Sequence, residues 1–414
     1  MSGRALEGIR VLDFTWVLAG PIMTRALAYH GAEVIRIETN KRLDPVIPFF
    51  AVNAETHAGK LSAGLDVSHP EGMKLFERLV KVSDVVADNY AAGVLARLGL
   101  TYERLSEINP KIIQLTMPAM GSSGPHKSDV TFGPNIHAVA GLDHLTGYPD
   151  ATPGGIGIAY ADYAAPGHAI VAILAALAYR DKSGKGQLID LSQFESLVSL
   201  LGPEMLTYFV NGEEPIRKGN DNSHQAPYNC YPTRGQDKWV AIAVSSDAEW
   251  VKLCGAMGKP SLANDPKFAT LAQRLRNQKA LDKIVGEWTA PKTAYEVMIT
   301  LQSQGVPSGM VLDIPEVIED RQLIARDFLH FGYPDHWLGK LNTGGIQAKL
   351  SETPGFAKTP APYMGEHNDY VFGTLLGMSK DEISKYVEKK VIEVTKPEDY
   401  PVPPQMAAMF PKKK

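Results

Sequence analysis

Short apolar runs alternate with amphipathic stretches along the first part of the chain. Four of the runs have the length and composition of buried strands: 8–14, 32–38, 84–89 and 112–117. Between them, 21–31 begins with proline and ends with glycine, and 69–83 repeats apolar residues at helical spacing. Strands separated by helices of this length predict right-handed crossovers and a mostly parallel sheet. This part of the chain is therefore predicted to form a doubly wound, Rossmann-like α/β domain.

Two further helices are predicted after the fourth strand. The stretch 164–180 is almost entirely apolar and rich in alanine, and a helix that is apolar on all sides is buried inside a large protein. Its longest apolar run, 169–179, is too short to span a bilayer. The second helix is expected over 193–210.

The pattern breaks at 218–237, which is rich in glycine, asparagine and proline, and a strand (239–244) and a helix (248–257) follow it. We therefore expect a second, smaller α+β domain. The predicted division is 1–210 for the N-terminal part of the large domain, 211–237 for a linker, 238–330 for the small domain, 331–392 for a return to the large domain, and 393–414 for a C-terminal tail.

Composition excludes several classes of protein. The 414 residues include 42 Lys+Arg and 46 Asp+Glu, giving a net charge of −4, whereas nucleic-acid-binding domains are strongly basic. Two cysteines, Cys230 and Cys254, are too few for a disulfide scaffold or a zinc cage. The first residues lack the apolar stretch of a signal peptide. We expect a cytoplasmic protein with no nucleic-acid or membrane partner.

Common cofactor and catalytic motifs are absent from the sequence. The first strand–turn–helix unit carries TWVLAGP at 15–21, without the glycines that let a dinucleotide approach the backbone. No P-loop, G-x-S-x-G or H-E-x-x-H motif occurs. His137, Asp143 and His144 lack the usual spacing of metal ligands, so we predict no metal site.

Several blocks of sequence, read in order, resemble the class III CoA-transferases of the formyl-CoA/carnitine type. The resemblance runs from Leu6 to about Ile392. The family's opening strand–helix–strand unit is matched in this chain by LEGIRVLDFTWVLAGPIMTRALAYHGAEVIRIE. Its central block is matched by IAYADYAAPGHAIVAILAALAYRDKSGKGQLIDLS, and a late block by APYMGEHN. Because the blocks follow the family's order and spacing, the chain is identified as a member. Coenzyme A thioesters are then its substrates, and no cofactor is bound permanently.

The resemblance assigns the nucleophile to Asp162, which shortly precedes the long apolar helix. From the residues alone, an aspartate there is more commonly a helix N-cap. The two roles are compatible, because the helix dipole and nearby N–H groups keep the carboxylate ionised, as nucleophilic attack requires. The family mechanism is covalent and passes through an aspartyl anhydride and an aspartyl-CoA thioester.

The resemblance also assigns residues to CoA binding. Thr39 stands where some relatives carry arginine, so Lys41 or Arg42 is a candidate for contacting a phosphate. The expected CoA-binding residues are Val17 and Ala19 near the thioester, Leu65 in the adenine pocket, and Asn89 and Arg97 on the nucleotide.

A glycine-rich active-site loop of the family corresponds here to KGNDNSH at 218–224, inside the predicted linker. Gly219 is its one glycine, so this loop departs from the family pattern. Asn220, Asn222 or backbone N–H groups are therefore the candidates for stabilising oxyanions in place of additional glycine N–H groups.

Two alternative functions remain open at this stage. Acyl-CoA α-methyl racemases resemble this chain and add a histidine, but that position is Phe132 here, and two-base racemisation needs both groups at one carbon. The other alternative is a non-catalytic or partner-dependent subunit of a heteromeric CoA-transferase. The family implies an interlocked, ring-like dimer, formed either by two identical chains or with a related subunit.

The motifs do not specify the substrate acids. Several aromatic residues lie near Asp162 in sequence and favour an aryl- or alkyl-substituted succinate as acceptor, with succinyl-CoA as donor. The same residues also fit ordinary core positions, and this interpretation stays open. They are Phe132, Tyr148, Tyr160 and Tyr163.

Overall fold

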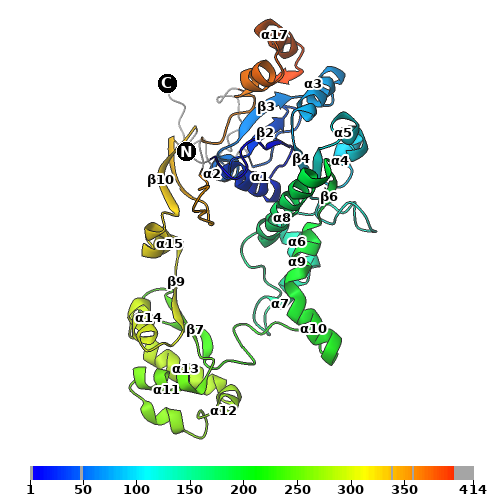
Figure 1. Cartoon of the computed structure of the whole chain (residues 1–414). Coiled ribbons are helices and arrows are strands. Elements are labelled where there is room, and N and C mark those ends of the chain that lie inside the picture. The colour runs from blue at the N-terminus through cyan, green and yellow to red at the C-terminus, as the bar shows by residue number, and fades with distance from the viewer. Residues whose placement is uncertain (1–2, 47–49, 337–338, 357–358, 396–414) are drawn as a thin grey trace. The chain divides into compact units, whose positions relative to one another are not determined.

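The computed structural model describes residues 3–46, 50–336, 339–356 and 359–395. The chain divides into two compact units (Figure 1). The first unit comprises Met1–Asp143, Gly155–Glu213 and Asp327–Lys414, and the second comprises His144–Gly154 and Glu214–Arg326.

A seven-stranded sheet with the order β12-β3-β2-β1-β4-β5-β6 forms the centre of the first unit. All neighbouring strands are parallel except β12 and β3. The predicted doubly wound, mostly parallel sheet is thus confirmed. Its strand order reverses direction at β1, so the carboxyl ends of β1 and β4 flank the crevice where such folds bind ligands. The strands are β1 Arg10–Asp13, β2 Glu33–Glu38, β3 Leu61–Leu65, β4 Val85–Asp88, β5 Ile113–Thr116, β6 Leu188–Asp190 and β12 Ile392–Glu393.

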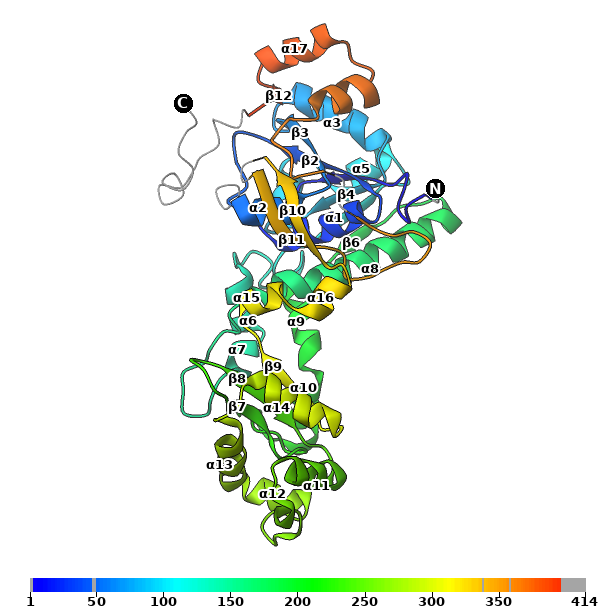
Figure 2. The same cartoon turned by 90° about the vertical axis from the view of Figure 1, so that its left-hand side faces the viewer.

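Helices cover both faces of this sheet, with α3 and α17 on one side and α1 and α8 on the other (Figure 2). Both faces of the sheet are apolar and are covered for that reason. In β1, for example, Leu12 packs into one apolar core and its neighbour Val11 into the other. The helices are α1 Ala19–Tyr29, α2 Phe50–His57, α3 Pro70–Lys81, α4 Val94–Arg97, α5 Tyr102–Ile108, α6 Gly133–Val139, α7 Leu142–Leu145, α8 Tyr160–Ser183, α9 Gln193–Val198, α10 Gly202–Asn211 and α17 Lys380–Glu388.

The long apolar helix differs from its prediction. Helix α8 begins four residues earlier than expected, and one of its faces, including Ala165 and Ala169, packs on the sheet. The opposite face is exposed in the single chain, where Val171 is 68% accessible. The single chain therefore does not bury α8 on all sides. By length and composition alone, α8 also meets the criterion for crossing a membrane, which the shorter run 169–179 does not.

The helix predicted over 193–210 is broken in the structure. It forms α9, a short 3-10 turn η1 (Ser199–Leu201) and α10. Gly202 and Pro203 begin α10, and a proline at this position starts a helix rather than continuing one.

The second unit is a small α+β fold, as expected from the sequence. Its antiparallel sheet has the order β7-β8-β9. The observed bounds differ from the predicted ones. The second unit takes His144–Gly154 from the predicted large domain 1–210, includes β7 and most of the predicted linker 211–237, and ends at Arg326 instead of residue 330. The sequence of β7 alternates with polar residues, so it did not predict a strand that pairs with β8. The elements are β7 Tyr228–Pro232, β8 Trp239–Ala243, α11 Asp247–Ala256, η2 Pro260–Asn264, α12 Leu271–Arg276, α13 Gln278–Thr289, α14 Ala294–Ser303, β9 Ser308–Val311, α15 Ile314–Ile318 and α16 Arg321–Ala325.

The chain then returns to the first unit through a hairpin of β10 (Leu329–Asp335) and β11 (Gly339–Gly344) and a π-helix, η3 (Asp369–Leu375). Strand β12 pairs with β3 and includes Glu393, which was assigned to the tail. Residues 396–414 of the predicted tail lie outside the described residues.

Candidate active site

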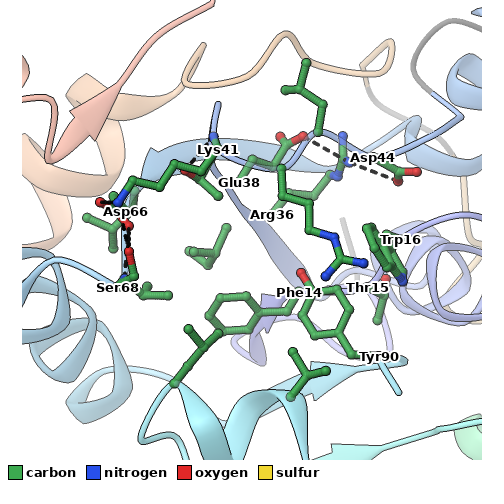
Figure 3. Close-up of a pocket in the computed structure, with 18 of the residues that line it drawn as sticks. Phe14, Thr15, Trp16, Arg36, Glu38, Lys41, Asp44, Asp66, Ser68 and Tyr90 are labelled. Atoms are coloured by element: carbon green, nitrogen blue, oxygen red, sulfur yellow. Dashed lines mark hydrogen bonds and ion pairs between the residues drawn. The ribbon is translucent and has the colours of Figure 1, made fainter. Parts of the chain in front are cut away.

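Two cavities lie at the carboxyl ends of the central strands. One, of about 380 Å³, is lined by residues that follow β1, β2 and β3, and we call it the β2–β3 cavity (Figure 3). The other, of about 390 Å³, is lined by Asp162 and is called the Asp162 cavity. The two cavities are adjacent, because five residues line both: Trp16, Arg42, Tyr90, Val94 and Arg97.

Asp162 lies in the first turn of α8 and not at its N-cap, which is Ala159. Its carboxylate accepts a hydrogen bond from the N–H of Ala19, the first residue of α1. Gly133 lies directly against it, since a Cβ at residue 133 would be 2.2 Å from Asp162 Oδ2. The nucleophile predicted from the resemblance is thus enclosed by the starts of three helices.

Burial raises the pKa of Asp162 to about 6, although the hydrogen bond from Ala19 lowers it. The sequence led us to expect that the helix dipole would keep this group readily ionised, and the structure shows that desolvation outweighs the N–H contacts. The carboxylate is still mostly ionised at neutral pH. It is also more basic than an ordinary aspartate, which favours nucleophilic attack.

The turn between β1 and α1 presents Val17 and Ala19 to this site. Val17 has a φ of 64°, a left-handed conformation that is rare for a β-branched residue. Asn89 binds the turn through two hydrogen bonds to the backbone of Trp16. Its Oδ1 accepts from the Trp16 N–H at 2.9 Å, and its Nδ2 donates to the Trp16 carbonyl at 3.0 Å. Asn89, predicted to contact the CoA nucleotide, therefore has its amide engaged by the backbone, although it lines the Asp162 cavity.

The other predicted CoA residues lie around the two cavities. Leu65, at the end of β3, lines the β2–β3 cavity, and Arg97, at the end of α4, lines both. Lys41 and Asp66 both line the β2–β3 cavity and are paired at 2.7 Å (Figure 3). Arg42 stacks on the Trp16 ring, with 4.3 Å between the guanidinium carbon and the ring centroid.

The predicted loop residues belong to the second unit. Gly219 has a φ of 58°, and a Cβ there would lie 2.6 Å from the Tyr148 ring, so the position requires glycine. Asn220 Nδ2 donates to Asn229 Oδ1 at 3.0 Å, and Asn222 Oδ1 accepts from a backbone N–H at 2.7 Å. Both asparagine side chains are thus engaged within their own unit.

Aromatic and histidine residues near Asp162 in sequence are distributed differently in space. Among the residues that the structure describes, Phe132 is the aromatic of that set that lines the Asp162 cavity. Tyr160 and Tyr163 are partly exposed on α8, and Tyr148 belongs to the second unit. His137 is buried and its Nε2 accepts the N–H of Ala161 at 3.1 Å, which supports the start of α8.

Comparison with known proteins agrees with this architecture. The model of CoA-transferase family III matches residues 6–368. The chain is 34% identical over 403 residues to the succinyl-CoA–D-citramalate CoA-transferase of Chloroflexus aurantiacus, covering 94% of this chain and 98% of that protein. It is 31% identical over 397 residues to the succinyl-CoA–L-malate CoA-transferase beta subunit of the same organism, with coverage of 94% and 98%.

The fold also matches a solved structure. A CAIB/BAIF family protein from Brucella suis superposes with a TM-score of 0.82 at 29% identity, covering 91% of this chain and all of that one. The family match spans most of the chain. The chain therefore belongs to CoA-transferase family III, as the sequence predicts, and is a CoA-transferase.

Proposed function

We propose that this enzyme transfers CoA from succinyl-CoA to a succinate substituted at C2, through covalent intermediates on Asp162. One observation carries the proposal: Asp162 lines a cavity that shares five lining residues with an adjacent cavity of similar size. An extended thioester can occupy both, with its nucleotide in the β2–β3 cavity and its carbonyl beside Asp162.

The reaction begins with attack of an Asp162 oxygen on the thioester carbonyl. The C–S bond breaks, CoA leaves as a thiolate, and a mixed anhydride remains. The thiolate then attacks the aspartyl carbonyl, succinate leaves, and Asp162 is held as a CoA thioester. The acceptor carboxylate attacks this thioester, and the released thiolate attacks the acceptor's acyl carbon, which regenerates the Asp162 carboxylate. No proton is transferred in the exchange.

Oxyanions formed at Asp162 need hydrogen-bond donors, each worth about 3–4 kcal/mol when well placed. The Ala19 N–H, which already binds this carboxylate, is one such donor. Gly219, Asn220 and Asn222 lie in the second unit, and the family's loop donors are assigned to them on the resemblance alone.

The acceptor class follows from chemistry shared by two relatives. Their names give D-citramalate and L-malate as acceptors, and both acids are succinates that carry substituents at C2. Phe132 at the Asp162 cavity is compatible with an alkyl or aryl substituent. A panel of isotopically labelled succinate, malate, citramalate and benzylsuccinate, each with unlabelled succinyl-CoA, distinguishes these classes by kcat/KM for formation of the new CoA ester.

Covalent trapping tests the mechanism. The enzyme is incubated with succinyl-CoA and hydroxylamine, and the modified residue is located by peptide mass spectrometry. A hydroxamate at Asp162 supports the proposal, and turnover without any adduct at Asp162 would contradict it. The racemase alternative would instead exchange the α-hydrogen of a 2-methylacyl-CoA with solvent deuterium. Phe132 lines the cavity at the position where racemases carry their second base, which argues against that reaction.

We also propose that the active form is an interlocked dimer, either of two copies or with a related subunit. Support comes from large apolar side chains that are exposed in the single chain, including Val171 on α8 and Phe209 and Val210 on α10, which are 68%, 77% and 79% accessible. Light scattering of the purified chain, with activity measured on the same fractions, tests this directly. A fully active monomer would overturn it.

Replacing Arg97 with methionine is expected to raise the KM for succinyl-CoA by about tenfold while changing kcat less than about twofold. Arg97 lines both cavities, and its guanidinium is suited to a CoA phosphate. The matched control is Arg78→Met, on α3, whose guanidinium binds the carbonyl of Leu376. An unchanged KM in Arg97→Met would remove Arg97 from the CoA site.

The pH dependence follows from the raised pKa of Asp162. Because the deprotonated carboxylate is the nucleophile, kcat/KM for succinyl-CoA should fall about tenfold per pH unit as pH drops below about 6. An ordinary aspartate would place this limb near pH 4. Initial rates between pH 5 and 8 locate the limb, and a flat profile down to pH 5 would contradict the raised pKa.

A further inference from the structure

The turn at residues 15–19 is held by side chains at nearly every backbone donor. This arrangement is unusual for a turn, because no secondary-structure ladder supplies the acceptors. The N–H groups pair with side-chain oxygens as follows: Thr15 with Asp13 at 2.8 Å, Trp16 with Asn89 at 2.9 Å, Val17 with Asp44 at 3.1 Å, and Ala19 with Asp162.

Val17 shows that the turn is under constraint. Its left-handed conformation is costly for a valine and persists only where the surroundings determine it. Both oxygens of Asp44 lie within 3.2 Å of the Val17 nitrogen. The direction of the next N–H groups, including the one that binds Asp162, therefore depends on groups behind the turn.

Lys60 lies behind the turn and is fully buried. Its ammonium joins the end of β1 to the start of α1, the helix whose first N–H binds Asp162. It does not line either cavity, so contact with a ligand does not explain its burial. Its contacts are Thr24 Oγ1 at 2.7 Å, the Pro21 carbonyl at 3.1 Å, Asp13 Oδ2 at 3.2 Å and His57 Nδ1 at 3.2 Å.

Thr24 completes the link, because its hydroxyl donates to Asp13 Oδ2 at 2.7 Å while accepting from Lys60. Asp13 in turn accepts both the N–H and the hydroxyl of Thr15, at 2.8 and 2.5 Å. On the other side of Lys60, the ring of His57 places Nε2 at 3.6 Å from Asp44 Oδ2. At that distance His57 makes no hydrogen bond to Asp44, so Lys60 and Thr24 support the Asp13 end of the turn, while Asp44 holds the Val17 end through its own contacts.

The charges in this cluster are compatible with neutral pH. Burial lowers the pKa of Lys60 to about 8, while the adjacent Asp13 carboxylate opposes the shift, so the ammonium persists. Burial also lowers the pKa of His57 well below its usual value, so its ring is neutral. Buried charges cost stability unless they are well paired. A cluster of this kind beside a catalytic turn is therefore better explained by positioning than by stability.

We propose that Lys60, acting through Thr24 and Asp13, is the positioning residue for the Ala19 N–H and thereby for the Asp162 carboxylate. The inference rests on the proposed function, since that assigns the chemistry to Asp162. The proposal predicts that replacing Lys60 or Thr24 changes kcat without changing CoA binding.

The test uses Thr24→Val, which keeps the shape and the ion pair but removes the bridging hydroxyl, and Lys60→Met. Thr24→Val is expected to lower kcat about tenfold or more with the KM for succinyl-CoA within about threefold, because a small misplacement of a catalytic group has effects of this size. Thr24→Ser restores the hydroxyl and should recover activity. The matched control is Arg180→Met, which removes the ion pair with Asp84, at 2.6 Å, at the amino end of β4 in the same sheet.

Hydrogen exchange measured by mass spectrometry supplies a readout that does not depend on activity. The peptide that covers residues 14–20 should exchange faster in Thr24→Val than in the wild type, and should be unchanged in Arg180→Met. Wild-type kcat in folded Thr24→Val and Lys60→Met, or equal losses in Thr24→Val and Thr24→Ser, would overturn the proposal.

Different measurements can contradict the proposed function of Asp162 and the positioning role of Lys60 and Thr24. If wild-type enzyme forms no adduct at Asp162 with any acyl-CoA, the proposed function is wrong. The exchange rates of residues 14–20 then still decide whether Lys60 and Thr24 hold the turn: unchanged exchange in Thr24→Val overturns positioning, and faster exchange supports it.

Discussion

Replacing Asp162 with asparagine is expected to abolish CoA transfer and to leave a folded protein. Removal of a covalent nucleophile typically costs a factor of about 10⁴ or more in kcat. Asparagine keeps the shape of the side chain and an oxygen that can accept the Ala19 N–H, so the starts of α1 and α8 retain their contact. The measurement is kcat for exchange between succinyl-CoA and an acceptor acid, together with hydroxylamine trapping.

The same variant should be more stable than the wild type at neutral pH. Burial raises the pKa of Asp162 to about 6, compared with about 4 in an unfolded chain. The folded protein therefore binds this proton more tightly, and the contribution of the group to stability decreases as pH rises from about 4 to 6. Above that range the wild type carries a buried charge that asparagine lacks. The difference in Tm should grow through this window and vanish below about pH 4.

Asp181→Asn is the matched control, since Asp181 lies in the last turn of the same helix and its side chain is 75% exposed. It should retain wild-type kcat and show no pH-dependent gain in Tm. Residual transfer above about 1% of wild type in Asp162→Asn, with no deamidation to aspartate found by mass spectrometry, would contradict the assignment of the nucleophile.

Replacing Gly133 with alanine is expected to have the next largest effect. A Cβ at this position would lie 2.2 Å from Asp162 Oδ2 and 2.8 Å from Ala159 Cβ, so the carboxylate must move. Gly133 is not among the residues with positive φ, so alanine can adopt its backbone conformation and the effect is steric. We expect kcat to fall about 100-fold and unfolding stability to decrease by about 1–3 kcal/mol.

Gly255→Ala on α11 is the control, because nothing lies within 4 Å of a Cβ there. A double variant isolates the cause. If the clash is with the carboxylate, Gly133→Ala should cost less stability in an Asp162→Ala background than in the wild type. Wild-type kcat in Gly133→Ala would show that this close contact has no role in placing Asp162.

Two opposing effects act on the pKa of the Asp162 carboxylate. It is buried deeply enough for its pKa to rise, which makes it a better nucleophile, and it accepts backbone N–H groups, which keep it ionised at neutral pH. The carboxyl ends of β1 and β4 place the supporting turn and Asn89 at the point where the strand order reverses. Doubly wound sheets bind ligands at this point, and here a turn supported by side chains occupies it.

The sequence by itself determined the doubly wound sheet, the small α+β unit and the family. Periodicity reports which face of a segment is buried, and this is a local property, so the strands and helices around 8–38 and 69–89 were predictable. Strands β3 and β6 were not, because LSAGL and LID are short and lack a strong apolar alternation. Their pairing with neighbours far along the chain decides their structure.

Tertiary structure decided how the candidate residues are used. Sequence could name Asp162 through resemblance, but its raised pKa comes from desolvation by segments distant in the chain. The amide of Asn89 binds Trp16, 73 residues away, and Lys60 meets Asp13, 47 residues away. Gly133 carries no local signal of contact with Asp162. Hydrogen bonds, burial and close packing between remote segments depend on the topology that brings them together, and one-dimensional patterns do not contain those distances.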